Sequence, residues 1–421
     1  MKNIVALSIL FLIETQFLFA SDSLFVITQI EVTGNKKTKS FIILRELLFK
    51  ENDSLSYTAL KEKIEGSKNN LFNTFLFNKT SIDIFDSTQN SIRLKVTVAE
   101  RWYTYPLPIM EIADRNFNVW WVEQHHDLKR LNAGIALLKR NIRGRNETLT
   151  LIAQTGYTRQ LGFQYEFPYI DKKLQKGLVL YSGYYQNKEV ASLTFNNKQL
   201  FLKDYSQFIR ERFQVGAIFR YRPKIYLRHS FEMNYTATHI ADTLATTAPD
   251  YLLDKKTNQQ YGLLKYIFEL DHRNVKAYPL KGYILTFAAT RWGLLPSDNI
   301  KMTEATLLLS KYSKLGNKLF LYNSIKLKSS LPSIQPYNLQ RAFGYGYDFV
   351  RGYEYYVIDG QHFGLFRNEI KYQIIKYRLQ SPIKKIDDQP FNVYLKTFFD
   401  AGYVKDKYYF KNNPFNNKWL T

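Results

Sequence analysis

The 421-residue sequence contains no cysteine, only 12 prolines, and 37 acidic residues against 59 lysines and arginines. The absence of cysteine excludes a disulfide framework and any thiolate metal site. After Ala20 no stretch approaches 18 uninterrupted apolar residues, so the remaining chain offers no candidate transmembrane helix. The net charge of +22 is spread along the chain, which argues against a defined nucleic-acid site. It suits contact with anionic lipid headgroups, or is a bias of composition.

The first 20 residues have the features of a secretory signal peptide. Lys2 provides a basic start, an apolar run follows from Ile4, and Ala20 is a small residue at the expected cleavage point. Glu14 interrupts the run, and Leu18 stands where a small residue is usual. The alternative, an N-terminal anchor helix, would need a longer run. We therefore predict an exported chain, either soluble or a membrane β-barrel.

Residues 24–99 have the pattern of a small α+β domain. In FVITQIEVTGNKK, Ile30 and Val32 alternate with polar residues, which predicts a strand that ends at the turn pair Gly34 and Asn35. Thr38 is the predicted N-cap of a following helix. The apolar face predicted for that helix consists of Phe41, Leu44 and Leu48.

A second amphipathic helix and two further strands complete this pattern. The helix is predicted from the spacing of Leu60, Ile64 and Leu71. The strands are predicted from alternation at Ile82 and Ile84 and along residues 92–98. The order is strand, helix, helix, strand, strand. Two helices on one face of such a sheet leave an open edge strand, which is a surface that binds extended partners by strand addition.

From Glu100 onward helical periodicity disappears and alternating segments follow one another at hairpin spacing. A dozen or so such segments, rich in Tyr and Phe, predict a transmembrane antiparallel β-barrel with lipid-facing apolar positions and a polar lumen. A soluble all-β protein would also alternate and is the competing interpretation. The clearest segments are RFQVGAIFRY (212–221), SFEMNYTA (230–237), LFLYNSIKLKS (319–329) and NEIKYQII (368–375).

The sequence offers little for catalysis or cofactor binding. His125 and His126 are adjacent, but the histidines show no zinc-ligand spacing, and no serine has a nucleophile-elbow context. Gly344 and Gly346 begin a glycine pattern that Phe349 leaves incomplete, so a dinucleotide site is not expected. We predict no enzyme activity, no metal and no cofactor.

Several segments resemble known families. The N-terminal pattern, with VTGNKKTKSFIILREL and LFNTFLF, resembles a POTRA domain. The remainder resembles the barrel of the BamA/TamA-type outer-membrane assembly and translocation family, in a short form with one POTRA domain. The segments that support this are NIRGRNETLTL, FQYEFPYIDKKLQKGLVLY, ELDHRNVKAYPLKGYIL, YGYDFVRGYE and TFFDAGYV.

The resemblance implies a functional cluster inside the barrel. In the family, the arginine of a V-R-G-[FY] motif lies on a loop that folds into the lumen and contacts a phenylalanine and an aspartate of the inner wall. Carried to this sequence, Arg351 would pair with Asp400 and lie against Phe398. The loop motif is then Val350, Arg351, Gly352 and Tyr353, with Gly352 allowing a close turn, and the wall motif is Phe398, Asp400 and Gly402.

The resemblance also implies a function without chemistry. The POTRA-like domain would lie in the periplasm and dock unfolded outer-membrane or secreted client proteins, with outer-membrane lipid and accessory periplasmic proteins as further partners. The barrel in the bacterial outer membrane would insert clients through a weak seam or, alternatively, pass them through its lumen. A passive porin is the third interpretation, although a pore needs no docking domain.

Two features depart from the family. Dedicated assembly subunits carry several POTRA domains, and this sequence has room for one. After FFDAGYV the sequence ends at NNKWLT, whereas the sixteen-stranded family barrel would continue to a terminal aromatic residue. We therefore expect a signal peptide over 1–20, a POTRA-like domain over 24–99, and over 100–421 a barrel that is incomplete at its C-terminus.

Overall fold

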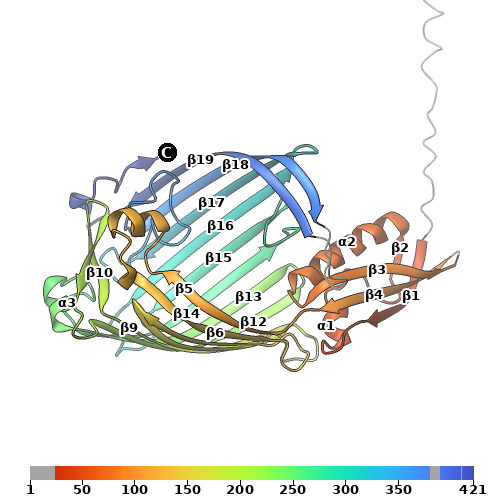
Figure 1. The fold of residues 1–421 in the computed structure, drawn as a ribbon, viewed down its shortest axis with the longest axis horizontal. Helices are drawn as coiled ribbons and strands as arrows, with labels where there is room; N and C mark the ends of the chain where they lie inside the picture. The colour runs from red at the N-terminus through yellow and green to blue at the C-terminus, as the bar shows by residue number, and fades with distance from the viewer. Residues whose placement is uncertain (1–23, 89, 380–388, 409) are drawn as a thin grey trace, which may run out of the picture.

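The structure is a computed structural model that describes residues 24–88, 90–379, 389–408 and 410–421. The predicted signal peptide, residues 1–20, lies outside the described residues. Figure 1 shows a small N-terminal domain beside a large, curved antiparallel sheet. The end of this barrel-like sheet that faces the N-terminal domain is called the near end, and the opposite one the far end.

The N-terminal domain is a four-stranded sheet with two helices. Its elements are β1 (Leu24–Thr33), α1 (Ser40–Leu44), β2 (Ser54–Ser56), α2 (Tyr57–Asn73), β3 (Phe77–Ser87) and β4 (Ser91–Glu100). The strands are arranged in the order β2-β1-β4-β3, with β1 parallel and β3 antiparallel to β4. The predicted order of elements is confirmed, and the three-residue strand β2 is an addition to it.

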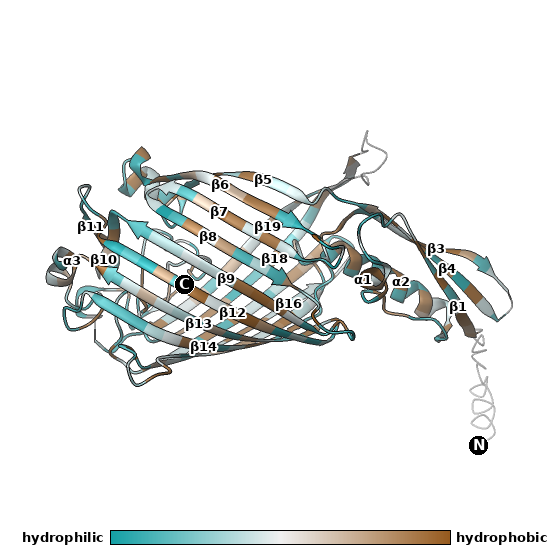
Figure 2. Cartoon of the chain, turned by 90° about the horizontal axis from the view of Figure 1, so that it is seen from below, coloured by the Kyte–Doolittle hydropathy of each residue, from teal (hydrophilic) through white to brown (hydrophobic). Residues whose placement is uncertain are grey.

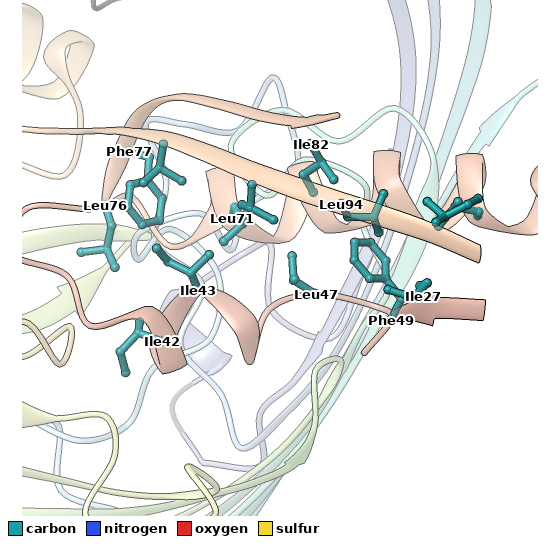
Figure 3. Close-up of a cluster of buried hydrophobic side chains, with 14 of the residues drawn as sticks. Ile27, Ile42, Ile43, Leu47, Phe49, Leu71, Leu76, Phe77, Ile82 and Leu94 are labelled. Atoms are coloured by element: carbon teal, nitrogen blue, oxygen red, sulfur yellow. The ribbon is translucent and has the colours of Figure 1, made fainter. Parts of the chain in front are cut away.

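The core of this domain lies between its sheet and its helices (Figure 3). Leu71 of α2 and Leu94 of β4 have no exposed surface, and Leu60 of α2 is 1% exposed. Ile64 packs against the same cluster, so the predicted face of the second helix is confirmed. Burial of each such side chain stabilises the domain by about 1.5 to 3 kcal/mol.

The predicted cap of the first helix is wrong. Lys39 is the N-cap of α1 and makes no side-chain capping bond. Thr38 is buried instead, and its hydroxyl lies 3.1 Å from the Tyr103 hydroxyl and accepts a hydrogen bond of 2.8 Å from Asn141 Nδ2. The Thr38 side chain therefore joins the N-terminal domain to the barrel rather than beginning a helix.

The predicted apolar face of this helix is also wrong. Ile42 and Ile43 are buried, whereas Phe41 and Leu44 are each 40% exposed and Leu48 is half-buried. A helix of five residues makes little more than one turn. Its buried face is therefore decided by tertiary packing and not by helical spacing.

Beyond the N-terminal domain, the described residues form a 14-stranded antiparallel sheet. Its strands are β5 (Thr104–Ile112), β6 (Leu131–Arg140), β7 (Thr148–Gly156), β8 (Thr158–Phe167), β9 (Lys176–Asn187), β12 (Arg210–Lys224), β13 (Leu227–Ile240), β14 (Asn258–Asp271), β15 (Gly282–Trp292), β16 (Met302–Lys314), β17 (Leu319–Leu331), β18 (His362–Leu379), β19 (Gln389–Lys405) and β20 (Trp419–Leu420). Each strand pairs with its neighbour in this order, so the predicted antiparallel barrel architecture is confirmed.

The strands alternate between an apolar outer face and a polar inner face. On β12, Phe213, Val215 and Phe219 are exposed to the outside, while Gln214 and Arg220 point the other way and are half-buried. Figure 2 shows this mixture along the outer wall, with hydrophilic ends on β8 and β9 toward the far end. This alternation is the one predicted from the sequence, and it suits a wall between lipid and a polar lumen.

Two strands form the edges of this sheet. Within the described residues β5 pairs only with β6, and β20 pairs only with β19 through Gly402 and Tyr403. The expectation that family strands are missing after β20 stays a prediction.

Shorter elements gather at the far end (Figure 1). They are the hairpin of β10 (Glu189–Phe195) and β11 (Lys198–Lys203), the helix α3 (Asp242–Thr247), the π-helix η1 (Val119–Glu123) and the 3-10 helices η2 (Leu128–Arg130) and η3 (Phe410–Asn412). Across the described ranges, no helix has both the length and the apolar character needed to cross a membrane.

Candidate functional site

Residues 332–361 connect β17 to β18 and are called the internal loop. An isolated bridge between Phe343 and Ile358 holds its two arms together. Its apolar side chains join side chains of the wall in one buried cluster, formed by Ala342, Phe343, Val350, Ile358, Phe363, Leu365, Val404 and Leu420. The loop therefore packs on the inner face of β18 and β19.

Arg351 is the polar centre of this packing. Its Nε donates to Asp400 Oδ2 at 2.7 Å, its Nη2 to Asp400 Oδ1 at 2.5 Å, and its backbone N–H to Asp400 Oδ2 at 3.1 Å. Its Nη1 donates to Glu369 Oε1 at 2.6 Å. The guanidinium carbon lies 3.8 Å from the centre of the Phe398 ring. The guanidinium of Arg351 thus binds the Asp400 carboxylate in a bidentate manner and stacks with its planar face on the Phe398 ring.

These four residues, Arg351, Glu369, Phe398 and Asp400, are called the Arg351 cluster. The side chains of Asp400, Glu369 and Arg351 are only 2%, 13% and 16% exposed. The structure brings together Arg351, Asp400 and Phe398, which the family resemblance had paired. Their functional role stays a prediction.

Glu369 is a member that the sequence reasoning missed. The alternation of the segment 368–375 predicted a polar face that includes Glu369, but it did not predict how β18 pairs with β19. Glu369 pairs with Phe398 and Arg367 pairs with Asp400 across the ladder of β18 and β19. This register puts the two carboxylates on neighbouring strands of the same wall, where one arginine reaches both.

The other motif residues shape the backbone and the packing around the cluster. Val350 is 1% exposed, and the Tyr353 ring meets the Phe415 ring edge-on at 5.5 Å. Gly352 has φ of +98°, a backbone conformation that favours glycine. An added Cβ would meet no atom within 4 Å, so the backbone conformation, and not a lack of space, requires glycine here. At Gly402 an added Cβ would lie 2.6 Å from the Val350 side chain. The wall therefore needs glycine at this position for the internal loop to pack against it.

Further polar contacts fix the segment just before Arg351. Arg367 donates to the carbonyl oxygens of Tyr347, at 2.7 Å, and of Phe349. Lys326 of β17 donates to Asp348 at 2.6 Å. The wall therefore binds this segment through side-chain and backbone groups on both sides of the apolar Val350.

A second buried cluster joins the N-terminal domain to the near end. Arg222 of β12 donates to Glu46 Oε1 at 2.7 Å and Oε2 at 2.9 Å, and Arg45 donates to Oε1 at 3.0 Å. Burial alone would raise the pKa of Glu46, but the charges and hydrogen bonds of Arg222 and Arg45 outweigh it and lower the pKa. Burial, with the Glu46 charge next in size, raises the pKa of Tyr169 to about 12.

The same junction includes hydrogen bonds to backbone carbonyls and a cavity. The Lys39 N–H donates to the Gly144 carbonyl at 2.9 Å, and Arg45 Nε donates to the Leu174 carbonyl at 2.6 Å. A cavity of about 390 Å³ also lies at this junction, and its lining includes Glu46, Tyr169 and Arg222. These contacts fix the N-terminal domain against the mouth of the barrel.

Among the residues that the structure describes, no three His, Asp or Glu side chains are grouped so as to hold a metal ion. His125 and His126 are exposed on a far-end turn.

Two family models match the chain. Residues 25–101 match POTRA, described as a surface antigen variable number repeat, and residues 141–418, more than half of the chain, match the Omp85 superfamily domain. The chain belongs to the Omp85 superfamily. β-Barrel proteins of this superfamily reside in the bacterial outer membrane, where they serve protein insertion or translocation in general. The N-terminal domain of this Omp85 protein is accordingly called the POTRA domain.

A search of solved structures found proteins that are similar to this Omp85 protein to different degrees. BamA from Haemophilus ducreyi lacking POTRA domains 1–3 matches with a TM-score of 0.53 and 15% identity, over 94% of this chain and 76% of that chain. CdiB from Escherichia coli matches with a TM-score of 0.47 and 10% identity, over 94% of this chain and 82% of that chain. CdiB from Acinetobacter baumannii matches with a TM-score of 0.47 and 13% identity, over 94% of this chain and 66% of that chain. A search of curated proteins found no significant match.

Proposed function

We propose that this chain is a non-enzymatic factor that inserts β-barrel proteins into the bacterial outer membrane or moves proteins across it. The POTRA domain, residues 24–99, lies in the periplasm and docks an unfolded client. The barrel, residues 100–421, passes the client into the lipid or through the membrane, and residues 1–20 direct export. Its partners are unfolded outer-membrane or secreted proteins, outer-membrane lipid and accessory periplasmic proteins.

The observation that supports this proposal most is the open edge of the POTRA sheet. β3 pairs only with β4 within the described residues, and its residues 83–87 are exposed. The opposite edge is the three-residue strand β2, which offers little to pair with. A strand with free N–H and C=O groups recruits an extended chain. β3 is therefore the docking strand that we propose for the client.

The barrel supplies a second strand edge at β5. The backbone N–H and C=O groups of β5 that point away from β6 have no partner strand in the described part of the chain. Because lipid cannot hydrogen-bond these groups, a client strand would stabilise them. The internal loop packs on the inner wall, an arrangement that weighs against the alternative of a passive porin with an open lumen.

The test is site-specific photo-crosslinking in intact cells. A photoreactive amino acid is placed at Asp83 on the exposed edge of β3, and the control is Lys61, exposed on α2. Adducts with many nascent outer-membrane barrels from Asp83 and few from Lys61 would support insertion, while a single secreted protein would support translocation. Equal, background labelling at both positions would contradict the docking proposal and leave the porin.

A further inference from the structure

The connection between β5 and β6, residues 113–130, binds the internal loop at residues that are separate from the Arg351 cluster. Arg115 Nη1 donates to the carbonyl oxygens of Gly344, at 3.3 Å, and Tyr356, at 3.1 Å. Arg115 Nη2 donates to the Tyr355 carbonyl at 3.2 Å. Asn116 Nδ2 adds a bond of 2.9 Å to the Glu354 carbonyl. Three side-chain nitrogens thus bind four peptide oxygens of the loop.

This contact is specific to the conformation of the loop. Across the described ranges Arg115 forms no salt bridge with a carboxylate. Its two Nη atoms donate to peptide oxygens that only the folded loop brings together, and its buried Nε has no hydrogen-bond partner. The Asn116 side chain is also fixed on its other side, because its Oδ1 accepts from the Val119 N–H at 2.8 Å at the start of η1. Arg115 and Asn116 are therefore held ready to bind the loop.

The connection itself is anchored at the far end. Arg130 is 1% exposed and donates to Asp114 at 2.6 and 2.8 Å and to Glu189 of β10. Its guanidinium also lies 4.5 Å from the centre of the Phe201 ring. Arg115 and Asn116 consequently extend from a rigid segment that continues directly from the edge strand β5.

The internal loop is thus held at two places that belong to opposite edges of the sheet. Arg351 binds β18 and β19, which adjoin the edge strand β20, and Arg115 lies three residues after the end of β5. We propose that Arg115 and Asn116 are positioning residues that tie β5 to the internal loop, so that the loop spans the two sheet edges from inside and limits how far β5 separates. The role of β5 as a client-binding edge rests on the proposed function; the tie itself does not.

Hydrogen exchange on the folded full chain in detergent micelles tests the tie without any client. Asn116→Asp keeps the oxygen that accepts from the Val119 N–H and removes the donor to Glu354, and Arg115→Gln removes the guanidinium. The loop is followed at the amides of Tyr356 and Val357, and the β5 connection at the Ala113 amide, which donates to the Arg130 carbonyl at 2.8 Å. The control is Arg212→Gln, a half-buried arginine of the inner wall on β12 whose Nε also lacks a partner.

We expect both variants to accelerate exchange at the loop and at Ala113 together. The increase should be at least about tenfold for Arg115→Gln, which loses bonds from a charged donor, and smaller, up to about tenfold, for Asn116→Asp, which loses one neutral bond. Arg212→Gln should change neither. Faster exchange in the loop alone, with Ala113 unchanged in both variants, would overturn the tie, as would no change at either place. If Arg115→Gln does not fold, Asn116→Asp decides the question by itself.

A second readout separates this inference from the proposed function. A photoreactive amino acid at Met110, which is 86% exposed on β5, reports capture of client strands in cells. With the tie present and β5 a client edge, Asn116→Asp should raise capture severalfold over the parent. Coupled exchange without any capture in parent or variant would contradict the client role of β5 and leave the tie standing.

Discussion

Replacing Arg351 with Ala should release the internal loop from the wall while the barrel remains folded. The substitution removes the three bonds of the guanidinium to Asp400 and Glu369 and its contact with the Phe398 ring. Asp400 would then remain buried at 4% exposure with its main partner gone. The loop therefore loses the polar contacts of the Arg351 side chain. It keeps its apolar packing and the contacts that Lys326 and Arg367 make with the preceding segment.

The expected cost follows from the burial and from the cations that remain. Removing one partner of a buried ion pair costs about 3 to 5 kcal/mol. The lower end applies, because Arg367 stays 4.0 Å from Asp400 and Lys371 stays 3.3 Å from Glu369. About 3 kcal/mol corresponds to roughly a 100-fold rise in the open fraction of the loop. Arg351→Lys should recover part of this, since an ammonium reaches one carboxylate and cannot stack as a guanidinium does.

The assay is hydrogen exchange of loop amides, read at Gly344 and Tyr353, whose N–H groups donate within the loop at 2.7 and 3.0 Å. The matched control is Arg341→Ala in the same loop, where the exposed arginine lies over the Tyr345 ring. Exchange that rises about equally in both variants, or in neither, would contradict a role of Arg351 in holding the loop.

Three further predictions concern neighbouring contacts. Phe398→Leu should open the loop by less than about tenfold, because a cation–π contact is worth roughly 0.5 to 2 kcal/mol; the same exchange experiment checks this. Gly402→Ala should displace the loop, since its Cβ would lie 2.6 Å from side chains of the loop, whereas Gly364→Ala, with 3.5 Å to its nearest neighbour, should not; protease protection of the loop compares the two. The pKa of Glu46 is lowered in the folded state, so its stabilising contribution is present above its usual value of 4.5 and is lost as the pH falls below it through the folded pKa. Spin-label distances between the POTRA domain and the barrel should therefore broaden in acid for the parent, with the pH dependence reduced in Glu46→Gln but kept in the exposed control Glu65→Gln.

The barrel was predictable because strand alternation has a period that the sequence displays directly. On β12 the outward Phe213 and Val215 and the inward Gln214 were assigned from spacing alone, and the exposures agree. The face of α1 was not predictable in this way. Five residues do not establish a helical period. Ile42 and Ile43 are buried because of tertiary packing in the N-terminal domain.

The candidate site was predictable only in part. The pairing of Arg351 with Asp400 came from the family resemblance, since 49 residues separate them and no local pattern joins them. Glu369 was assigned to the polar face of its strand, but its contact depends on the register with Phe398, which spacing does not give. Arg115 gave no signal at all, because its partners are backbone oxygens and their arrangement is visible only in the folded loop.

Reconstitution tests the central claim, that this protein handles protein clients and is not a solute pore. Vesicles of phosphatidylcholine and phosphatidylglycerol containing the full chain, its Arg351→Ala variant, or no protein receive a urea-unfolded outer-membrane barrel, an unfolded secreted protein and a small sugar. Insertion and entry are measured by protease protection and solute flux by light scattering. We predict faster insertion or entry of a protein client with the parent chain, a clear loss with the Arg351→Ala variant, and no sugar flux above empty vesicles. Rapid sugar flux with neither client accelerated would contradict the account.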